Sequence, residues 1–162
     1  MSAVLRVAAY VKLAKLWEKR RRQAVAYHWQ YYHEKFDDNP DIELIDLYID
    51  ITGRKEICHR PEMLRLLRDC TLGKIDCIAT QTQAYLAANT QEFCYLIKFV
   101  FDMSPPIEIM TEDENYNFNT ILNVDYQREA LLKMANDFVA LRPSAYEEWK
   151  SRIVDGMNKL VE

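Results

Sequence analysis

Glycine is scarce in this chain, which has only three glycines among its 162 residues. They stand far apart, at Gly53, Gly73 and Gly156. A phosphate-binding loop needs several glycines beside the start of a helix, because its backbone must approach the phosphate closely. The scarcity of glycine therefore argues against nucleotide binding of the familiar kinds.

The chain also lacks the residue spacing that metal sites show. Its four cysteines are Cys58, Cys70, Cys77 and Cys94. None of them forms the short paired spacing of a zinc site. His28 and His33 are five residues apart on a predicted helix, so their side chains diverge by roughly 140°, and His59 stands alone. The sequence therefore predicts no metal and no cofactor.

Long apolar runs and a secretory signal are missing as well. No apolar run approaches the roughly 20 residues that span a bilayer, so we expect no membrane partner. Without a secretory signal, the cysteines are expected to be reduced thiols in the cytoplasm.

Positive charge is in the minority, with a formal net charge of -4 and a pI near 5.5. Domains that coat nucleic acid by bulk charge are usually basic, so any DNA contact must come from a local patch. One segment is rich in basic residues and contains a single acidic residue, Glu18. Its basic residues are Lys12, Lys15, Lys19, Arg20, Arg21 and Arg22. From Lys15 onward these residues are candidates for weak, sequence-independent DNA binding, and a solvated helix face is the alternative.

Strands and helices alternate along the chain. Short apolar runs with β-branched residues predict strands at 6–11, 42–49, 75–80 and 107–110. Apolar residues at helical spacing predict helices at 15–36, 61–72, 90–101, 120–141 and 144–160. Because each parallel connection needs a crossover, this alternation predicts an α/β fold with a mainly parallel sheet and helices on both faces.

The length suits one compact domain. We assign residues 1–141 to that domain and residues 142–162 to a C-terminal helix after a break at Pro143. Ser144 and Glu147 have the spacing of a capping box, which predicts a new helix start there.

Ligands and catalysis in open α/β sheets collect at the carboxyl ends of the strands. The segments at the carboxyl ends of the first three predicted strands are 12–14, 50–53 and 80–84. In these segments no Ser, Cys or His stands beside a partner that could activate it as a nucleophile. Four aromatic residues on the first predicted helix offer stacking groups for nucleic-acid bases, but we expect them in the core. They are Tyr27, Trp29, Tyr31 and Tyr32.

Several segments, taken in order, resemble the N-terminal catalytic-type domain of serine site-specific recombinases, the resolvase and invertase family. The resemblance covers about residues 5 to 140 and is nearest to the large transposon-type and integrase-type members. Arg6 to Val11 resembles the family's first strand, Gln30-Tyr31-Tyr32 its first helix, and Arg60-Pro61-Glu62-Met63 its RPEF stretch. Gly73-Lys74-Ile75-Asp76 and the later Ala88-Asn89-Thr90 resemble its GKIDLI strand and RNT helix start.

The resemblance implies a resolvase-like, three-layer fold with a four- to five-stranded sheet and C-terminal helices. It also implies DNA recombination chemistry, in which a serine attacks a phosphodiester and arginines stabilise the transition state. The family's first-strand motif ends Arg-Val-Ser, whereas this chain has Lys12-Leu13-Ala14. After the third strand the family typically has a Ser- or Asp-Arg pair and another arginine one turn on, whereas this chain has Ala84, Tyr85 and Ala88. Only Arg60 matches a family arginine, which predicts a pseudo-recombinase without an intact catalytic site.

The leading interpretation is a non-catalytic interaction or regulatory module of a mobile element, which pairs with itself or with an active serine recombinase. A dimer interface is predicted on the helix at 120–141, through Ile121, Leu131, Leu132, Ala135 and Phe138. One alternative is a divergent, active recombinase that cleaves DNA with Thr52 or Thr82. Another is the decayed remnant of a recombinase gene.

Overall fold

The computed structural model describes residues 4–113, 119–120 and 124–161. Its sheet has four parallel strands in the order β2-β1-β3-β4. The strands are β1 (Leu5–Leu13), β2 (Ile42–Ile51), β3 (Cys77–Ala79) and β4 (Glu108–Met110). This confirms the predicted α/β fold with a parallel sheet.

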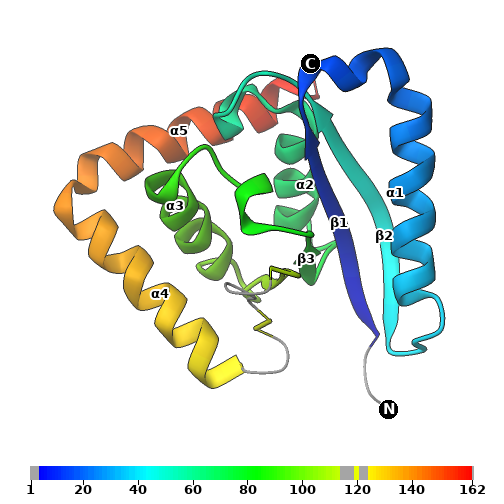
Figure 1. The fold of residues 1–162 in the computed structure, drawn as a ribbon. Coiled ribbons are helices and arrows are strands. Elements are labelled where there is room, and N and C mark those ends of the chain that lie inside the picture. The colour runs from blue at the N-terminus through cyan, green and yellow to red at the C-terminus, as the bar shows by residue number, and fades with distance from the viewer. Residues whose placement is uncertain (1–3, 114–118, 121–123, 162) are drawn as a thin grey trace.

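Five α-helices and three short 3-10 helices connect and cover these strands within the described residues. The α-helices are α1 (Arg21–Phe36), α2 (Pro61–Thr71), α3 (Thr90–Phe101), α4 (Val124–Leu141) and α5 (Pro143–Lys159). The 3-10 helices are η1 (Lys15–Arg20), η2 (Ile57–His59) and η3 (Gln83–Tyr85). The sheet is enclosed on both sides, with α1 on one face and α2, α3 and α5 on the other (Figure 1).

The alternation of side chains along β1 divides the core into two parts. Val7, Ala9 and Val11 face α1, whereas Ala8 and Tyr10 face the opposite helices. All five are fully buried, as expected for a central strand of a sheet covered on both sides.

The predicted helix at 15–36 is divided in two. Residues 15–20 form the 3-10 helix η1, and the α-helix begins only at Arg21. Arg20 has φ -124° and ψ 32°, outside the helical range. No residue of η1 is buried, so no packing favours a regular α-helix there.

The expectation that all four aromatics of α1 lie in the core is wrong for two of them. Tyr27 is 62% exposed and Trp29 is 44% exposed. The face that α1 buries carries Ala24, His28, Tyr32 and Phe36, four residues apart. Since one residue turns the helix by about 100°, the neighbours of His28 point away from the sheet.

The C-terminal helix begins at Pro143, so the predicted break is present. The predicted capping box is wrong, because Arg142 is the N-cap residue and Ser144 lies inside the first turn. Proline is favoured at the first helical position, where its missing N–H costs nothing.

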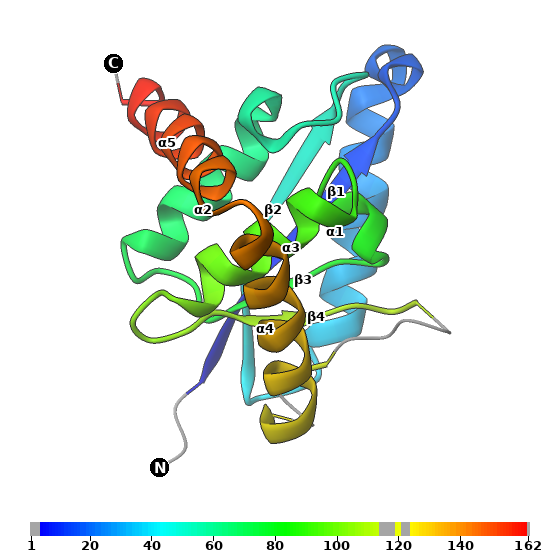
Figure 2. The same cartoon turned by 90° about the vertical axis from the view of Figure 1, so that its left-hand side faces the viewer.

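Helix α5 folds back over α2 and α3 (Figure 2). Its buried residues share the core of the sheet's second face; they are Tyr146, Trp149, Ile153 and Met157. At Gly156 a Cβ atom would lie only 2.9 Å from Cδ1 of Leu64 on α2, so the two helices approach closely at this point.

Candidate functional site

The carboxyl edge of the sheet joins β1 and β2 through a buried carboxylate. Lys12 and Asp50 lie opposite each other in the two strands. Asp50 is 3% exposed, and the hydroxyl of Tyr10 donates to its Oδ2 at 2.8 Å. Burial, followed by the negative charge of Asp50, raises the pKa of Tyr10. The Tyr10 hydroxyl is therefore a stable donor at neutral pH.

Asp50 also fixes the start of α2. The backbone amides of Glu62 and Met63 donate to its two carboxylate oxygens at 3.0 and 2.9 Å. The first N–H groups of a helix have no partner within the helix, and the N-terminus attracts negative charge. Asp50 thus holds α2 against the sheet edge, which is a structural role.

Arg60 directly precedes α2 and is almost completely buried, with 1% exposure. Its Nη1 donates to the carbonyl of Tyr85 at 2.6 Å, and its Nη2 donates to the carbonyl of Lys55. The guanidinium therefore links the loop after β2 to η3. Both terminal nitrogens thus donate to the protein's own backbone, whereas Nε is buried without a hydrogen-bond partner among the described residues.

Lys12 lies close to this cation. Its Nζ donates to the carbonyl of Thr52 at 3.3 Å. Partial burial, and next the positive charge of Arg60, hold the pKa of Lys12 below its ordinary value. The edge thus contains two cations, both donating to backbone carbonyls.

The structure also places the other positions that the family resemblance singles out. Ala14 is exposed directly after β1, and its carbonyl accepts from the amide of Trp17 at 3.0 Å. Ala84 is exposed, whereas Tyr85 and Ala88 are half-buried. The carbonyl of Tyr85 accepts the hydrogen bond from Arg60, whereas the amide of Ala88 donates to Glu92 at 2.9 Å.

Neither threonine considered as an alternative nucleophile stands beside a general base. Thr52 Oγ1 accepts from the amide of Arg54 at 3.0 Å. Thr82 Oγ1 accepts from the amide of Ala84 at 3.2 Å and caps η3. Both hydroxyls therefore serve as local turn caps, and neither has a hydrogen-bonded His, Asp or Glu in the described structure.

The basic run borders the same edge, on η1 and the start of α1 (Figure 1). Its five candidate DNA-binding residues, Lys15, Lys19, Arg20, Arg21 and Arg22, are all exposed. Arg21 forms two hydrogen bonds with Glu18, at 2.9 and 2.7 Å. The other four form no ion pair within the part of the chain that the structure describes.

The predicted dimer surface on α4 is smaller than the sequence suggests. Leu131 and Ala135 are buried in this chain's own core, against α3, so they are not available to a second copy. Leu132 and Phe138 are half-buried and remain candidates. Ile121 lies outside the described residues.

Sequence reasoning missed Glu92, a buried carboxylate that joins three segments. It accepts hydrogen bonds from the amides of Ile57 and Ala88 at 3.2 and 2.9 Å, and from Nε1 of Trp149 at 2.8 Å. The available signal was Asn89, three residues before Glu92. Its side chain accepts from the Glu92 amide at 2.8 Å, as an N-cap residue does.

Solved structures of recombinase catalytic domains share this fold. The N-terminal catalytic domain of TP901-1 integrase superposes with a TM-score of 0.59 at 17% identity, covering 86% of this chain and 98% of that one. The C-terminal catalytic domain of ISC1926 TnpA, an IS607-like serine recombinase, superposes with a TM-score of 0.53 at 13% identity, covering 97% and 99%. No family model matches the sequence, and no curated protein matches it significantly.

These neighbours define the class of the fold. It is the resolvase-like α/β fold of serine recombinase catalytic domains, as the sequence segments indicate. This chain has that fold, with Lys12, Ala14 and Tyr85 near the carboxyl ends of the sheet's strands. Among the described residues, no helix is both long and apolar enough to cross a bilayer.

Proposed function

We propose that this protein is a catalytically inactive serine-recombinase-like domain that serves as an interaction or regulatory module in the DNA recombination of a mobile element. Ala14 carries the proposal. It stands where the family resemblance expects the nucleophilic serine, and a methyl group cannot attack a phosphodiester.

The surroundings of Ala14 support the same conclusion. Arg60, the only arginine that matches the family's set, is buried and donates to two backbone carbonyls. Ala84 and Ala88 supply no charge, and Lys12 lacks the two-pronged geometry of a guanidinium. Loss of one donor to a developing oxyanion costs about 3 to 4 kcal/mol of barrier. Losing the nucleophile and several cations together abolishes transesterification.

A covalent trapping assay tests this proposal. The protein is incubated with supercoiled plasmid and with a nicked duplex that retains any covalent intermediate, beside an active serine recombinase as positive control. We expect no nicking and no protein–DNA adduct. Ala14→Ser should also form no adduct, because the arginines are still missing. An adduct of the unmodified chain on the nicked duplex contradicts the proposal.

Two variants separate the proposal from a divergent active enzyme. If Thr52 or Thr82 attacks DNA, the unmodified chain forms an adduct that Thr52→Val or Thr82→Val removes. We expect neither variant to change anything, because both hydroxyl oxygens cap local turns.

The proposed partner is a second copy of the chain or an active serine recombinase. Co-purification with recombinases encoded beside this gene tests the second choice. A stable complex that alters the partner's recombination rate supports a regulatory role. A folded protein that neither self-associates nor binds such a recombinase indicates a decayed remnant instead.

A further inference from the structure

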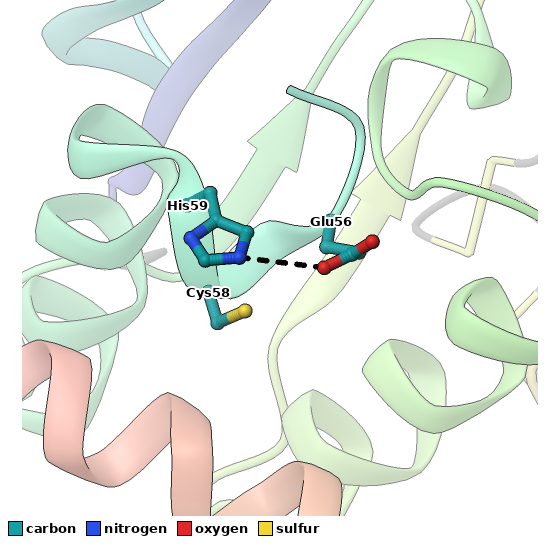
Figure 3. Close-up of side chains that lie close together, drawn as sticks. All are labelled: Glu56, Cys58 and His59. Atoms are coloured by element: carbon teal, nitrogen blue, oxygen red, sulfur yellow. Dashed lines mark ion pairs between the residues drawn. The ribbon is translucent and has the colours of Figure 1, made fainter.

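Three side chains with metal-binding atoms converge beside the short helix η2 (Figure 3). Each of Glu56, Cys58 and His59 offers one ligand atom, and these atoms lie within 4.8 Å of one another. His59 Nε2 is 3.4 Å from Glu56 Oε2. This site has no signature among the histidines alone or the cysteines alone, because its three ligands are of three different types within four residues.

The local backbone explains this convergence. Glu56 is the extended N-cap residue of η2 and His59 is the last residue of η2. The His59 amide donates to the Glu56 carbonyl at 3.0 Å, and this turn brings the two side chains together. Ile57 points the other way and is fully buried, and Glu92 holds its amide at 3.2 Å. The three ligands therefore extend from an anchored turn, with Cys58 half-buried and the other two exposed.

We propose that Glu56, Cys58 and His59 bind one Zn²⁺ ion. A thiolate, an imidazole and a carboxylate are the ligand types that zinc takes in proteins, and three protein ligands leave a fourth position for water. Calcium and magnesium are bound by oxygen atoms instead. Zinc–ligand bonds of about 2.0 to 2.3 Å place neighbouring ligand atoms about 3.3 to 3.7 Å apart in a tetrahedron. His59 Nε2 and Glu56 Oε2 already lie at this spacing, and all three ligand atoms lie within 4.8 Å of one another.

The local charge also fits a divalent cation. The Glu56 carboxylate and the Cys58 thiolate together neutralise Zn²⁺. Cys58 borders two hollows beneath α5, to which Glu148 and Asp155 add negative charge. Two cations oppose this charge: Arg152 borders both hollows, and Lys159 borders the second. Replacing Arg152 by a neutral residue should therefore tighten metal binding, whereas a purely structural role of the cluster predicts no such effect.

Metal titration of the reduced, untagged protein tests the site. Zn²⁺ is titrated against a chromophoric chelator, and Co²⁺ is titrated as a spectroscopic substitute. We expect one ion per chain and a thiolate-to-cobalt charge-transfer absorption. Cys58→Ser should remove this absorption, and both Cys58→Ser and His59→Gln should weaken Zn²⁺ binding at least about tenfold, since even losing an outer-shell partner costs about 10- to 100-fold.

A matched control uses the histidine–carboxylate pair on α1. His33 Nδ1 lies 2.9 Å from Asp37 Oδ1 on α1, so His33→Gln should leave Zn²⁺ binding unchanged. Arg152→Gln should bind Zn²⁺ more tightly, and circular dichroism shows whether each variant is folded. The proposal is overturned if no saturable binding occurs, if Cys58→Ser keeps the absorption, or if His33→Gln abolishes binding. These outcomes do not depend on whether the domain cleaves DNA.

Discussion

Glu92→Gln tests whether one buried carboxylate on α3 fixes the C-terminal helix α5 and the short helix η2 to α3. The substitution keeps the shape of the side chain but leaves one acceptor oxygen in place of two. In the structure, Ile57 and Ala88 donate backbone amides to Oε1, and Trp149 donates Nε1 to Oε2. With glutamine, either the two backbone amides or the Trp149 indole N–H must face an NH₂ group, which cannot accept their hydrogen bonds. At least one of these buried donors then loses its acceptor.

The magnitude follows from the loss of charge-assisted hydrogen bonds, which contribute about 1.5 to 3 kcal/mol each. We therefore expect Glu92→Gln to lower the free energy of unfolding by about 2 to 3 kcal/mol. For a domain of this size, each kcal/mol lowers Tm by about 2 to 4 °C, which gives a decrease of about 4 to 12 °C. With a urea m-value of about 2 kcal/mol per M, the midpoint of unfolding falls by about 1 M or more.

Urea unfolding followed by circular dichroism measures this loss, with Glu147→Gln as control. Glu147 is exposed on α5, so its substitution should change the free energy of unfolding by less than about 0.5 kcal/mol. Trp149→Phe removes the indole N–H, and its double-mutant cycle with Glu92→Gln should give a coupling of about 1.5 to 3 kcal/mol. Unchanged stability of Glu92→Gln, or strictly additive effects, refutes the reasoning.

Two further predictions concern the proposed interactions. If the basic run contacts DNA phosphates, its four unpaired cations give a log-log salt slope of roughly -4. Fluorescence anisotropy on a generic duplex should then show weak binding that Arg20→Ala/Arg21→Ala/Arg22→Ala removes; identical flat titrations for both proteins point to a solvated helix face. Self-association should appear in light scattering at micromolar concentration and be lost in Leu132→Asp. A monomer that this substitution leaves unchanged contradicts an interface on α4.

Much of the fold follows from local sequence patterns. The helix expected at 90–101 is α3 itself, because Asn89 caps it and a dense apolar face follows. The break at Pro143 is equally local, since proline's missing N–H favours a helix start. Where backbone chemistry decides the outcome, a single sequence is sufficient.

The features that the sequence analysis missed depend on contacts between distant segments. The exposure of Tyr27 and Trp29 reflects how narrow a stripe of α1 the sheet can cover. Burial of Leu131 depends on the angle at which α4 meets α3. Trp149 reaches Glu92 across 57 residues. No periodicity in the sequence encodes such pairings.

Arg60, which the family resemblance matches to a catalytic arginine, has a structural role of its own in this chain. Its removal takes the charged donor from the carbonyls of Lys55 and Tyr85, and a hydrogen bond from a charged group contributes about 1.5 to 3 kcal/mol. The contribution of Arg60 to the stability of the fold is therefore independent of whether any phosphodiester is cleaved. The presence of this arginine therefore does not by itself indicate activity, whereas the exposed side chain of Ala14 has no such structural role.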